Sequence, residues 1–308
     1  MHKVSIILPS YNHDKFLKDR LDSILNQTYT NWKLIIIDDC STDGSVKILK
    51  EFQKNHDDKI SDFMINTKNS GSGYNSWKKG IELASSEYIW VAETDDYSDI
   101  TFLEYMVNAL EENKNVSLAF CSSNYVDFQK NNLYNSQKRT EDLNVRSGNY
   151  GIIRGQRYIE KMPFNTYITN GSSVVFRKPM LELPKYLFIH KQCSDIFFWT
   201  FLLKGSSFIF LNKELNYFRR HEGSTTTKMN ILQRKNIYEE KIQYLNYFNQ
   251  TDKFQVLLHH YVKHYLWNNK KDLFNYDFLK EINNIKYIDN KYYLSIVRFI
   301  FNKVKNDK

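Results

Sequence analysis

Four consecutive residues in the first third of the chain carry the strongest chemical signal: Glu93, Thr94, Asp95 and Asp96. They follow an apolar run over residues 88–92, which predicts a buried strand. Carboxylates crowded at a strand end repel one another unless a positive charge is bound among them. A hard divalent cation relieves this repulsion, and Mg²⁺ typically takes one or two carboxylates together with phosphate oxygens. The run therefore predicts a metal-assisted diphosphate site, although acids that only open a helix give the same pattern.

Two more strand ends carry polar side chains. Asp38 and Asp39 come directly after the apolar run 34–37, and Asn12 lies just beyond the first apolar run. In a parallel sheet, ligands bind beyond the carboxyl ends of the strands. An adjacent pair of acids at such an end can accept hydrogen bonds from a base or a ribose. Asp43 is better explained as a helix cap.

The apolar pattern predicts the elements that must bring these residues together. Helical spacing of apolar residues predicts helices over 16–25 and 46–52. Strands that alternate with helices indicate a mostly parallel sheet with helices on both faces, which is an α/β fold. The sequence predicts buried strands at 4–8, 34–37, 88–92, 173–176 and 208–211.

The last quarter of the chain differs in composition from the rest. After Gly223 there is neither Gly nor Pro for about 85 residues, which predicts a helical appendage because these two residues are the strongest helix breakers. From residue 227 onward, 15 Lys and Arg face 8 Asp and Glu, so this part carries nearly all of the net charge of +8. Residues 291–305 have the pattern of a basic amphipathic helix. Its apolar face either packs on the body of the protein, contacts a membrane surface peripherally, or binds a protein partner.

Composition argues against several other classes. Cys40, Cys121 and Cys193 are scattered and form no CxxC pair, which speaks against a zinc site or a disulfide scaffold and for a reducing compartment. No run approaches the roughly 20 apolar residues that span a bilayer, so a cytoplasmic protein is expected. No recognition motif for nucleic acid accompanies the basic C-terminal residues, so no nucleic acid partner is expected.

Four segments, in this order and spacing, resemble the family 2 glycosyltransferases of the GT-A fold: VSIILPSYN, IIIDDCSTDGS, NSGSGYNSWKKGI and YIWVAETDD. The resemblance covers roughly residues 1–225. It implies a nucleotide-sugar donor, a divalent cation (Mg²⁺ or Mn²⁺) and inversion at the anomeric carbon of the transferred sugar. We therefore expect a GT-A fold with a nucleotide-sugar-binding half at 1–120, an acceptor-binding half at 121–225 and a basic helical region at 226–308.

The resemblance also implies roles for individual residues. Asp95 matches the metal-binding second acid of the family's DxD element, and His221 lies in an element that reaches the diphosphate or the metal. Asp195 matches the general base that takes the proton from the acceptor hydroxyl. From the residues alone, it is most simply the N-cap of the apolar helix that follows it. The residues expected at the nucleotide and donor are Pro9, Tyr11, Asn12, Asp38, Asp39, Asn69, Gly71, Lys78, Glu93, Asp96 and Arg219. Those expected at the sugar and acceptor are Asn170, Gly171 and Ser172, for which an ordinary turn is the alternative.

The chain departs from the family pattern in two places. Glu93 stands where the family usually has Asp, which keeps the charge but reaches farther. Trp77 and Lys78 stand where Arg and Asn are common, and Lys78 either faces a phosphate or is solvated.

The sequence thus predicts an inverting transferase that moves a sugar from a nucleotide-diphosphate sugar to a glycan or lipid-linked acceptor. UDP is favoured over TDP, and the product would be a surface polysaccharide such as capsule or lipopolysaccharide. A catalytically silent nucleotide-sugar-binding protein and a sugar nucleotidyltransferase are the alternatives. The latter would release pyrophosphate, and its usual glycine-rich, basic loop after the first strand is missing here.

Overall fold

The computed structural model describes residues 3–221, 231–258 and 260 of the 308-residue chain. The contacts between Cα atoms divide the chain into two units, Met1–Lys228 and Met229–Lys308. This boundary lies close to the expected end of the acceptor-binding half. The expected division at residue 120 stays a prediction, and a single strand, β6 (Val116–Val126), runs through it.

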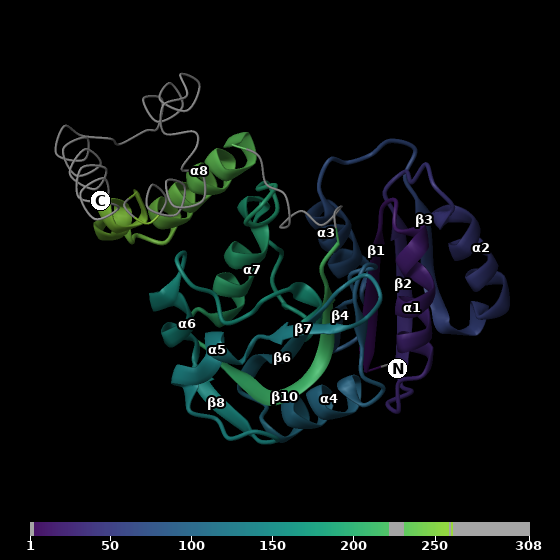
Figure 1. Cartoon of the computed structure of the whole chain (residues 1–308), viewed down its shortest axis with the longest axis horizontal. Helices are drawn as coiled ribbons and strands as arrows, with labels where there is room; N and C mark the ends of the chain where they lie inside the picture. The colour runs from purple at the N-terminus through teal and green to yellow at the C-terminus, as the bar shows by residue number, and fades with distance from the viewer. Residues whose placement is uncertain (1–2, 222–230, 259, 261–308) are drawn as a thin grey trace, which may run out of the picture. The chain divides into compact units, whose positions relative to one another are not determined.

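The first unit alternates strands and helices along its N-terminal half and is more irregular afterwards (Figure 1). Its remaining strands are β1 (Val4–Ser10), β2 (Trp32–Asp38), β3 (Ile60–Ile65), β4 (Tyr88–Val91), β5 (Tyr97–Ser98), β7 (Asn132–Asn135), β8 (Tyr150–Arg154), β9 (Val174–Arg177) and β10 (Ser207–Arg219). Its helices are α1 (Asp14–Leu25), α2 (Ser45–Asn55), α3 (Gly73–Leu83), α4 (Phe102–Glu112), α5 (Gln137–Thr140), α6 (Gly155–Lys161) and α7 (Ser194–Leu203). The 3₁₀ turns are η1 (Asp57–Lys59), η2 (Glu141–Leu143), η3 (Gly171–Ser173) and η4 (Lys185–Leu187).

These strands form one curled, ten-stranded mixed sheet in the order β3-β2-β1-β4-β9-β6-β10-β5, with β7 beside β6 and β8 beside β10. The four strands from β3 to β4 are parallel, and β1 aligns Ser10 with Asp38 of β2 and Ile7 with Val91 of β4. Strand β9 is antiparallel to both of its neighbours, β4 and β6, and β10 is parallel to β6. The α/β fold is confirmed, and its parallel part is the N-terminal half that carries the expected nucleotide residues.

Helices cover both faces of this sheet, as the alternation predicted. On one face Trp90 of β4 packs on Phe102 of α4, with 4.8 Å between ring centroids, in a core that also takes in α1 and α2. On the other face α3 lies close enough to β1 that a Cβ on Gly80 would come 2.4 Å from Cγ2 of Ile7. Glycine at position 80 is therefore what allows this close approach, because any larger residue would overlap the strand.

The five strands predicted from apolar runs are confirmed as β1, β2, β4, β9 and β10, and the two predicted helices as α1 and α2. Strands β3, β5, β6, β7 and β8 were not predicted, because they are short or are interrupted by polar residues. Strands β5 and β8 pair antiparallel with β10, which is distant in the sequence, and β7 pairs antiparallel with β6, which directly precedes it.

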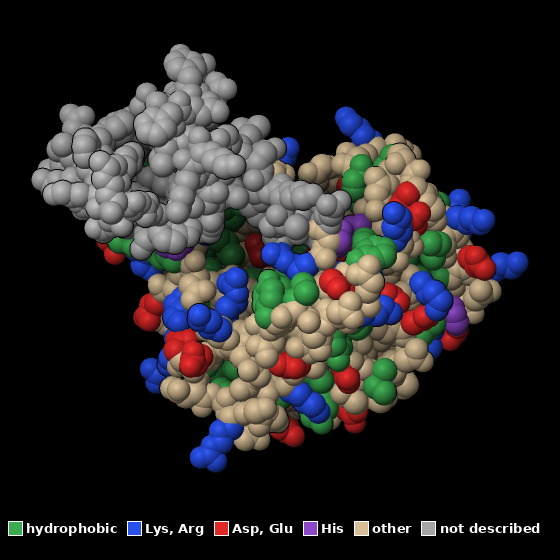
Figure 2. Space-filling view, viewed as in Figure 1, with side chains coloured by type: hydrophobic (Ala, Val, Ile, Leu, Met, Phe, Trp, Pro, Cys, Tyr) green, Lys and Arg blue, Asp and Glu red, His purple; other side chains and the backbone are tan. Residues whose placement is uncertain are grey.

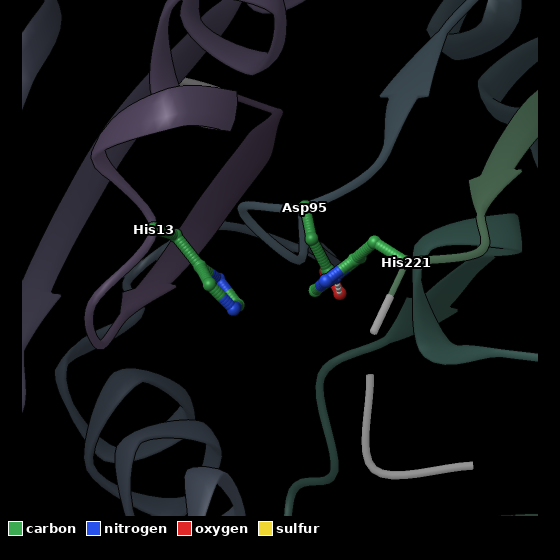
Figure 3. Close-up of side chains that lie close together, drawn as sticks. All are labelled: His13, Asp95 and His221. Carbon is green, nitrogen blue, oxygen red and sulfur yellow. Dashed lines mark hydrogen bonds and ion pairs between the residues drawn. The ribbon is translucent and has the colours of Figure 1, made fainter. Parts of the chain in front are cut away.

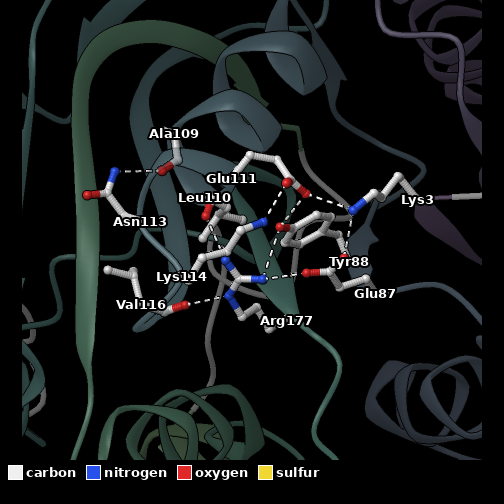
Figure 4. A network of polar contacts seen from close by, with 10 residues as sticks. All are labelled: Lys3, Glu87, Tyr88, Ala109, Leu110, Glu111, Asn113, Lys114, Val116 and Arg177. Carbon is white, nitrogen blue, oxygen red and sulfur yellow. Dashed lines mark hydrogen bonds and ion pairs between the residues drawn. The ribbon is translucent and has the colours of Figure 1, made fainter.

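A polar network closes the edge of the sheet at which β4 begins, away from the carboxyl ends of the parallel strands (Figure 4). The Arg177 guanidinium donates to the carbonyl oxygens of Leu110 (2.6 Å) and Val116 (3.0 Å) and to the Glu87 carboxylate (2.6 Å). Arg177 thereby ties the end of β9 to the chain between α4 and β6.

Glu111 is the centre of charge in the same network. Its carboxylate accepts hydrogen bonds from Lys114, from the Tyr88 hydroxyl (2.7 Å) and from Lys3 (3.0 Å). These bonds lower the pKa of Glu111 to about 2. The network joins the first described residue of the chain to α4.

The described part of the second unit is helical. It consists of α8 (Ile231–Tyr247), the 3₁₀ turn η5 (Thr251–Lys253) and a further helical stretch to residue 258. Tyr238, Ile242, Tyr244 and Leu245 are buried. The amphipathic helix expected over 291–305 lies outside the described residues. Among the described residues, no helix combines the length and the apolar character required to cross a membrane.

The visible surface of the first unit mixes Lys and Arg with Asp and Glu, and no single sign of charge dominates it (Figure 2). This agrees with the near balance of 28 basic and 27 acidic residues over positions 1–226.

Candidate active site

The parallel strands deliver the predicted polar residues to one edge of the sheet. Because β1, β2 and β4 run in the same direction and in register, the residues after Ser10, Asp38 and Val91 emerge side by side. Asp39 donates its backbone N–H to the Ser10 carbonyl (2.8 Å), and Ala92 donates to Ile7 (2.8 Å), so the strands stay joined up to these ends.

Three side chains from distant parts of the chain converge here: His13, Asp95 and His221 (Figure 3). His13 follows β1, Asp95 follows β4 and His221 follows β10. One ligand atom of each lies within 4.8 Å of the others, and Nε2 of His221 is 3.2 Å from Oδ2 of Asp95. The structure therefore brings together the predicted pair Asp95 and His221 and adds His13, which was not predicted.

Asp95 keeps its charge in this setting. Burial favours its neutral form, but the hydrogen bond from His221 and the adjacent imidazoles of His13 and His221 outweigh burial and hold the pKa of Asp95 below its usual value. Burial also lowers the pKa of His13, so its imidazole is neutral near pH 7. A charged carboxylate beside a neutral imidazole is a donor set that suits a cation.

Asp96 faces away from the histidines. Its Oδ2 accepts from the Asn170 side-chain amide, and its Oδ1 accepts from the backbone N–H of Arg219 (3.0 Å). Burial and the neighbouring charge of Asp95 raise the pKa of Asp96 to about 7. Asp96 therefore links η3 to β10.

A buried arginine lies beneath the acidic run. Arg20 of α1 is fully buried, and its guanidinium donates to the carbonyl oxygen of Glu93 (2.7 Å) and to the Ser172 hydroxyl (3.1 Å). Burial lowers the pKa of Arg20 to about 10, although Asp96, Asp95 and Glu93 oppose this, so Arg20 is charged at neutral pH. Its positive charge interacts favourably with all three acids of the run.

Glu93 is turned into the protein. Its Oε1 accepts a hydrogen bond of 2.7 Å from the indole of Trp77, and its backbone N–H donates to Ser172 Oγ (3.1 Å). Burial, followed by the charges of Asp95 and Asp96, raises the pKa of Glu93 to about 8. At neutral pH this side chain is therefore mainly a neutral acid.

The residues in and beside the η3 turn contact the residues of the acidic run and their neighbours. Ser172 is fully buried and also accepts Trp90 Nε1–H on its carbonyl oxygen (2.9 Å). Gly171 lies against the Trp77 ring, since a Cβ there would come 2.3 Å from the ring edge. Asn170 connects Asp96 to Asn216 of β10 (3.1 Å).

The second strand end holds a loop through Asp39. The Asp39 carboxylate accepts from the Asn66 amide (2.7 Å) and from the backbone N–H (3.0 Å) and hydroxyl (2.8 Å) of Ser70. Asn69 donates to the Asp39 carbonyl (3.1 Å) and accepts from the N–H of Gly71 (2.7 Å), which has a φ of +81°. Asp39, Asn69 and Gly71 are thus brought together, as predicted, in one hydrogen-bonded turn.

The neighbouring residues are divided between support and surface. Asp38 is buried and accepts from the backbone N–H and hydroxyl of Ser41 (2.8 and 2.7 Å). Asn12 accepts from the N–H of Thr42 (2.8 Å), and Pro9 is buried within β1. Tyr11 is 45% exposed, so its ring is available to a ligand beside the Asp39 loop.

Asp195 lies in the first turn of α7, which begins at Ser194 after Cys193. The N-cap interpretation of Asp195 is therefore wrong: the N-cap is Cys193, and Asp195 is the second residue of the helix. Asp195 is half-buried. Burial, and after it the negative charge of Asp195, raises the pKa of the Tyr74 hydroxyl well above its ordinary value. Tyr74 in turn packs on Trp77 (5.4 Å), which connects Asp195 with the Glu93 side of the site.

Two predicted donor residues have other partners. Lys78 approaches Glu82 on the exposed side of α3 (3.8 Å). The buried Arg219 guanidinium pairs with Asp19 (2.8 Å) and lies over the Phe16 ring (5.0 Å), while its backbone N–H serves Asp96.

Asp95 and His221 have the spacing of two ligands of one divalent cation. Two ligand atoms on adjacent corners of an octahedron, each about 2.1 Å from the metal, lie about 3 Å apart. The 3.2 Å between His221 Nε2 and Asp95 Oδ2 matches this spacing. One carboxylate and two imidazoles are all established ligand types.

Comparison with known proteins identifies the family of this chain. The model of "Glycosyl transferase family 2" matches residues 5–182, which is more than half of the chain. The chain belongs to this family. It is accordingly a glycosyltransferase with the GT-A fold.

Relatives from several bacteria share the matched region. The chain is 25% identical over 236 residues to glycosyltransferase GlyG of Streptococcus pneumoniae, covering 72% of each chain. It is 36% identical over 112 residues to the putative glycosyltransferase EpsE of Bacillus subtilis, covering 36% of this chain and 40% of that protein. It is 33% identical over 114 residues to a poly(ribitol-phosphate) beta-glucosyltransferase of Bacillus spizizenii, where it covers only 18% of the relative.

Among solved structures, residues 1–349 of S. aureus TarS in complex with UDP-GlcNAc superpose with a TM-score of 0.61 at 16% identity, covering 91% of this chain and 78% of that one. The likeness supports the GT-A fold.

Proposed function

We propose that this glycosyltransferase moves a sugar from a UDP-sugar to a hydroxyl of a glycan or lipid-linked acceptor, with inversion, in the synthesis of a surface polysaccharide. The observation that carries the proposal is the approach of Asp95 and His221 to each other beside the Asp39 loop at the carboxyl edge of the sheet. A cation site next to a nucleotide site is what a nucleotide-diphosphate donor requires. The TarS complexes with UDP and UDP-GlcNAc, which share the fold, make uridine diphosphate the first nucleotide to test.

The nucleotide would lie against the Asp39 loop. Tyr11 offers an exposed ring face, and the turn around Asn69 and Gly71 offers backbone groups. Asp39 holds this turn in place through Ser70. Asp38 and Asn12 hold the neighbouring residues Ser41 and Thr42, and Pro9 is buried in β1.

Asp95 and His221 would hold Mg²⁺ or Mn²⁺. Such a cation would offset the negative charge that develops on the departing diphosphate. The protein's own part is to keep Asp95 ionised beside His221, while burial and the neighbouring acidic charges favour the neutral forms of Glu93 and Asp96.

Asp195 would be the general base. An ionised carboxylate on the first turn of α7 is favoured by the helix dipole and can accept the proton of the acceptor hydroxyl as that oxygen attacks the sugar. Asn170, Gly171 and Ser172 would contribute by positioning Trp77, Glu93 and Asp96 around the sugar.

A lipid-linked acceptor would bring the protein to a membrane surface. A lipid-linked acceptor would be met at the inner face of the membrane, with the basic region 226–308 as the peripheral contact. Co-sedimentation with anionic vesicles tests this part, since vesicles of neutral lipid should leave the chain in the supernatant.

The reaction is tested by incubating the full chain with a panel of UDP-sugars, a Mn²⁺ salt and short glycan acceptors. Release of UDP that depends on acceptor, together with a product whose anomeric configuration is opposite to that of the donor, supports the proposal. Release of pyrophosphate, or donor binding without any turnover across the panel, would contradict it.

A further inference from the structure

We propose that His13 is a third protein ligand of the divalent cation, and that two imidazoles with one carboxylate make the centre select Mn²⁺ over Mg²⁺. The inference rests on the proposed function, because it concerns the cation at the same site. It goes further in assigning a ligand outside the acidic motif and the closing element.

The hydrogen bonds around His13 determine which ring nitrogen faces the cluster. His13 Nδ1 lies 2.6 Å from the Thr94 hydroxyl oxygen, and the same hydroxyl donates to the Pro9 carbonyl (3.2 Å). A carbonyl oxygen can only accept, so when the single proton of the Thr94 hydroxyl lies in the bond to Pro9, His13 Nδ1 is the donor of the 2.6 Å bond to Thr94. Nε2 of the neutral ring is then unprotonated, which is the form that binds a metal.

The backbone holds the ring in this place. The N–H of His13 donates to Ser45 Oγ (3.0 Å), and its carbonyl accepts from the N–H groups of Phe16 (2.9 Å) and Leu17 (3.1 Å). The imidazole packs edge-on against Phe16 and lies 6.0 Å from the His221 ring at an interplanar angle of 86°. Figure 3 shows His13 and His221 projecting from opposite sides, with Asp95 between their segments.

The neighbouring acids are committed elsewhere. Glu93 accepts from Trp77, and both oxygens of Asp96 accept from Asn170 and Arg219. Asp95 is therefore the one acid of the run that faces the two imidazoles, and the set of protein donors is two nitrogens and one oxygen.

This donor set has a chemical preference. Mg²⁺ favours oxygen ligands and water, whereas imidazole nitrogen suits first-row transition metals. Each imidazole in the set therefore raises the affinity for Mn²⁺ relative to Mg²⁺. Removing the His13 side chain should lower the ratio of the Mn²⁺ affinity to the Mg²⁺ affinity. Replacing His13 by a residue with an amide oxygen should lower the same ratio by raising the affinity for Mg²⁺.

The test is a titration of Mn²⁺ into the full chain with UDP present, with free Mn²⁺ followed by electron paramagnetic resonance and Mg²⁺ measured by competition. We expect His13→Ala to weaken Mn²⁺ binding at least about tenfold, because losing a ligand should cost no less than losing an outer-shell partner of a ligand, which typically costs about 10–100-fold. His13→Gln should shift the balance toward Mg²⁺. His56→Ala, which removes a histidine remote from the cluster after α2, is the matched control and should bind Mn²⁺ as the wild type does.

The outcomes distinguish the role of His13 from the existence of the cation site. Wild-type Mn²⁺ binding that is unchanged in His13→Ala would overturn the role of His13 and leave the proposed function in place. No Mn²⁺ binding by the wild type would overturn the cation site and the proposed mechanism with it. If His13→Ala fails to fold, electron spin echo modulation of Mn²⁺ bound to the wild type still decides, since two coupled imidazole nitrogens support the inference and one refutes it.

Discussion

The indole N–H of Trp77 donates a hydrogen bond of 2.7 Å to Oε1 of Glu93. These are two of the positions at which the chain departs from the residues common in its family. The departures are in direct contact, so the longer acid is matched by a neutral donor that reaches it. Glu93 is thereby held in the interior of the site, together with Ser172 and Arg20.

This contact predicts the effect of Trp77→Phe. Phenylalanine keeps much of the ring packing but leaves the buried Glu93 carboxyl without its donor, which should lower the free energy of unfolding by about 1–3 kcal/mol. Glu93→Asp should also destabilise the protein, although it restores the family's usual residue, because the shorter side chain no longer reaches the indole. Urea unfolding of both variants and of the double variant provides the coupling energy. Strictly additive effects would show that the bond contributes nothing.

Asp195→Asn tests the base. The amide cannot accept the acceptor's proton, so turnover should fall by about 10²–10⁴-fold while the UDP-sugar still binds. Asp62→Asn on β3, far along the sheet from α7, is the control and should keep full turnover. Near-normal turnover of Asp195→Asn would mean that another group takes the proton.

The structure also separates the two aspartates of the acidic run. Asp95→Asn should abolish Mn²⁺ binding, because Asp95 is the carboxylate beside the histidines. Asp96→Asn should retain Mn²⁺ binding but lower the free energy of unfolding by about 1–3 kcal/mol, since one of its hydrogen bonds, to Asn170 or to Arg219, is lost. Equal losses of Mn²⁺ in the two variants would be at odds with this division.

Gly80→Ala tests the packing of α3 on β1. The added Cβ meets Ile7 at 2.4 Å and should destabilise the protein by about 1–3 kcal/mol through overpacking. Gly73→Ala in the same helix has no atom within 4 Å of the new Cβ and is the control, which should be neutral or slightly stabilising. Ile7→Ala should relieve the clash in the double variant. The measurement is thermal unfolding of the wild type, Gly80→Ala, Gly73→Ala, Ile7→Ala and the Gly80→Ala/Ile7→Ala double variant.

The edge network predicts a pH dependence. Hydrogen bonds from Lys114, Tyr88 and Lys3 depress the pKa of Glu111 to about 2, so its stabilisation is fully present above its ordinary pKa of 4.5 and is lost as the pH falls toward 2. Glu111→Gln should therefore have a lower melting temperature than the wild type at pH 7, and the gap should narrow below about pH 4. A gap that is constant from pH 7 to pH 3 would show that the charge is not the cause.

Much of the fold could be predicted because its signals are local. Apolar runs identified β1, β2, β4, β9 and β10, and the polar residues beyond them identified the nucleotide edge. Strands β3 and β6 were missed because polar residues interrupt their apolar pattern, and the short strand β7 pairs locally with β6. Strands β5 and β8 could not be predicted, since their pairing with β10 depends on contacts between residues distant in the chain.

The site was predicted less completely for the same reason. Asp95 and His221 were expected together, but His13 was passed over, because a single histidine between a strand and a helix carries no signal of its own. Its position directly after the SYN segment, at the end of the first strand, was the available hint. The roles of Asp38 and Ser172 as buried supports could not be read from sequence either, because burial depends on the packed fold.

Strand β10 has a consequence for how the protein is made. Residues 5–182 contain every parallel strand of the N-terminal half, yet Asp195, β10 and His221 come later in the chain. A ribosome-bound chain can thus pair its first four strands early, while the strand that lies between β6 and β5 and leads to His221 is still being synthesised. Until that strand is added the cation cluster has only two of its three side chains. The complete cluster can therefore form only when the first unit is almost fully synthesised.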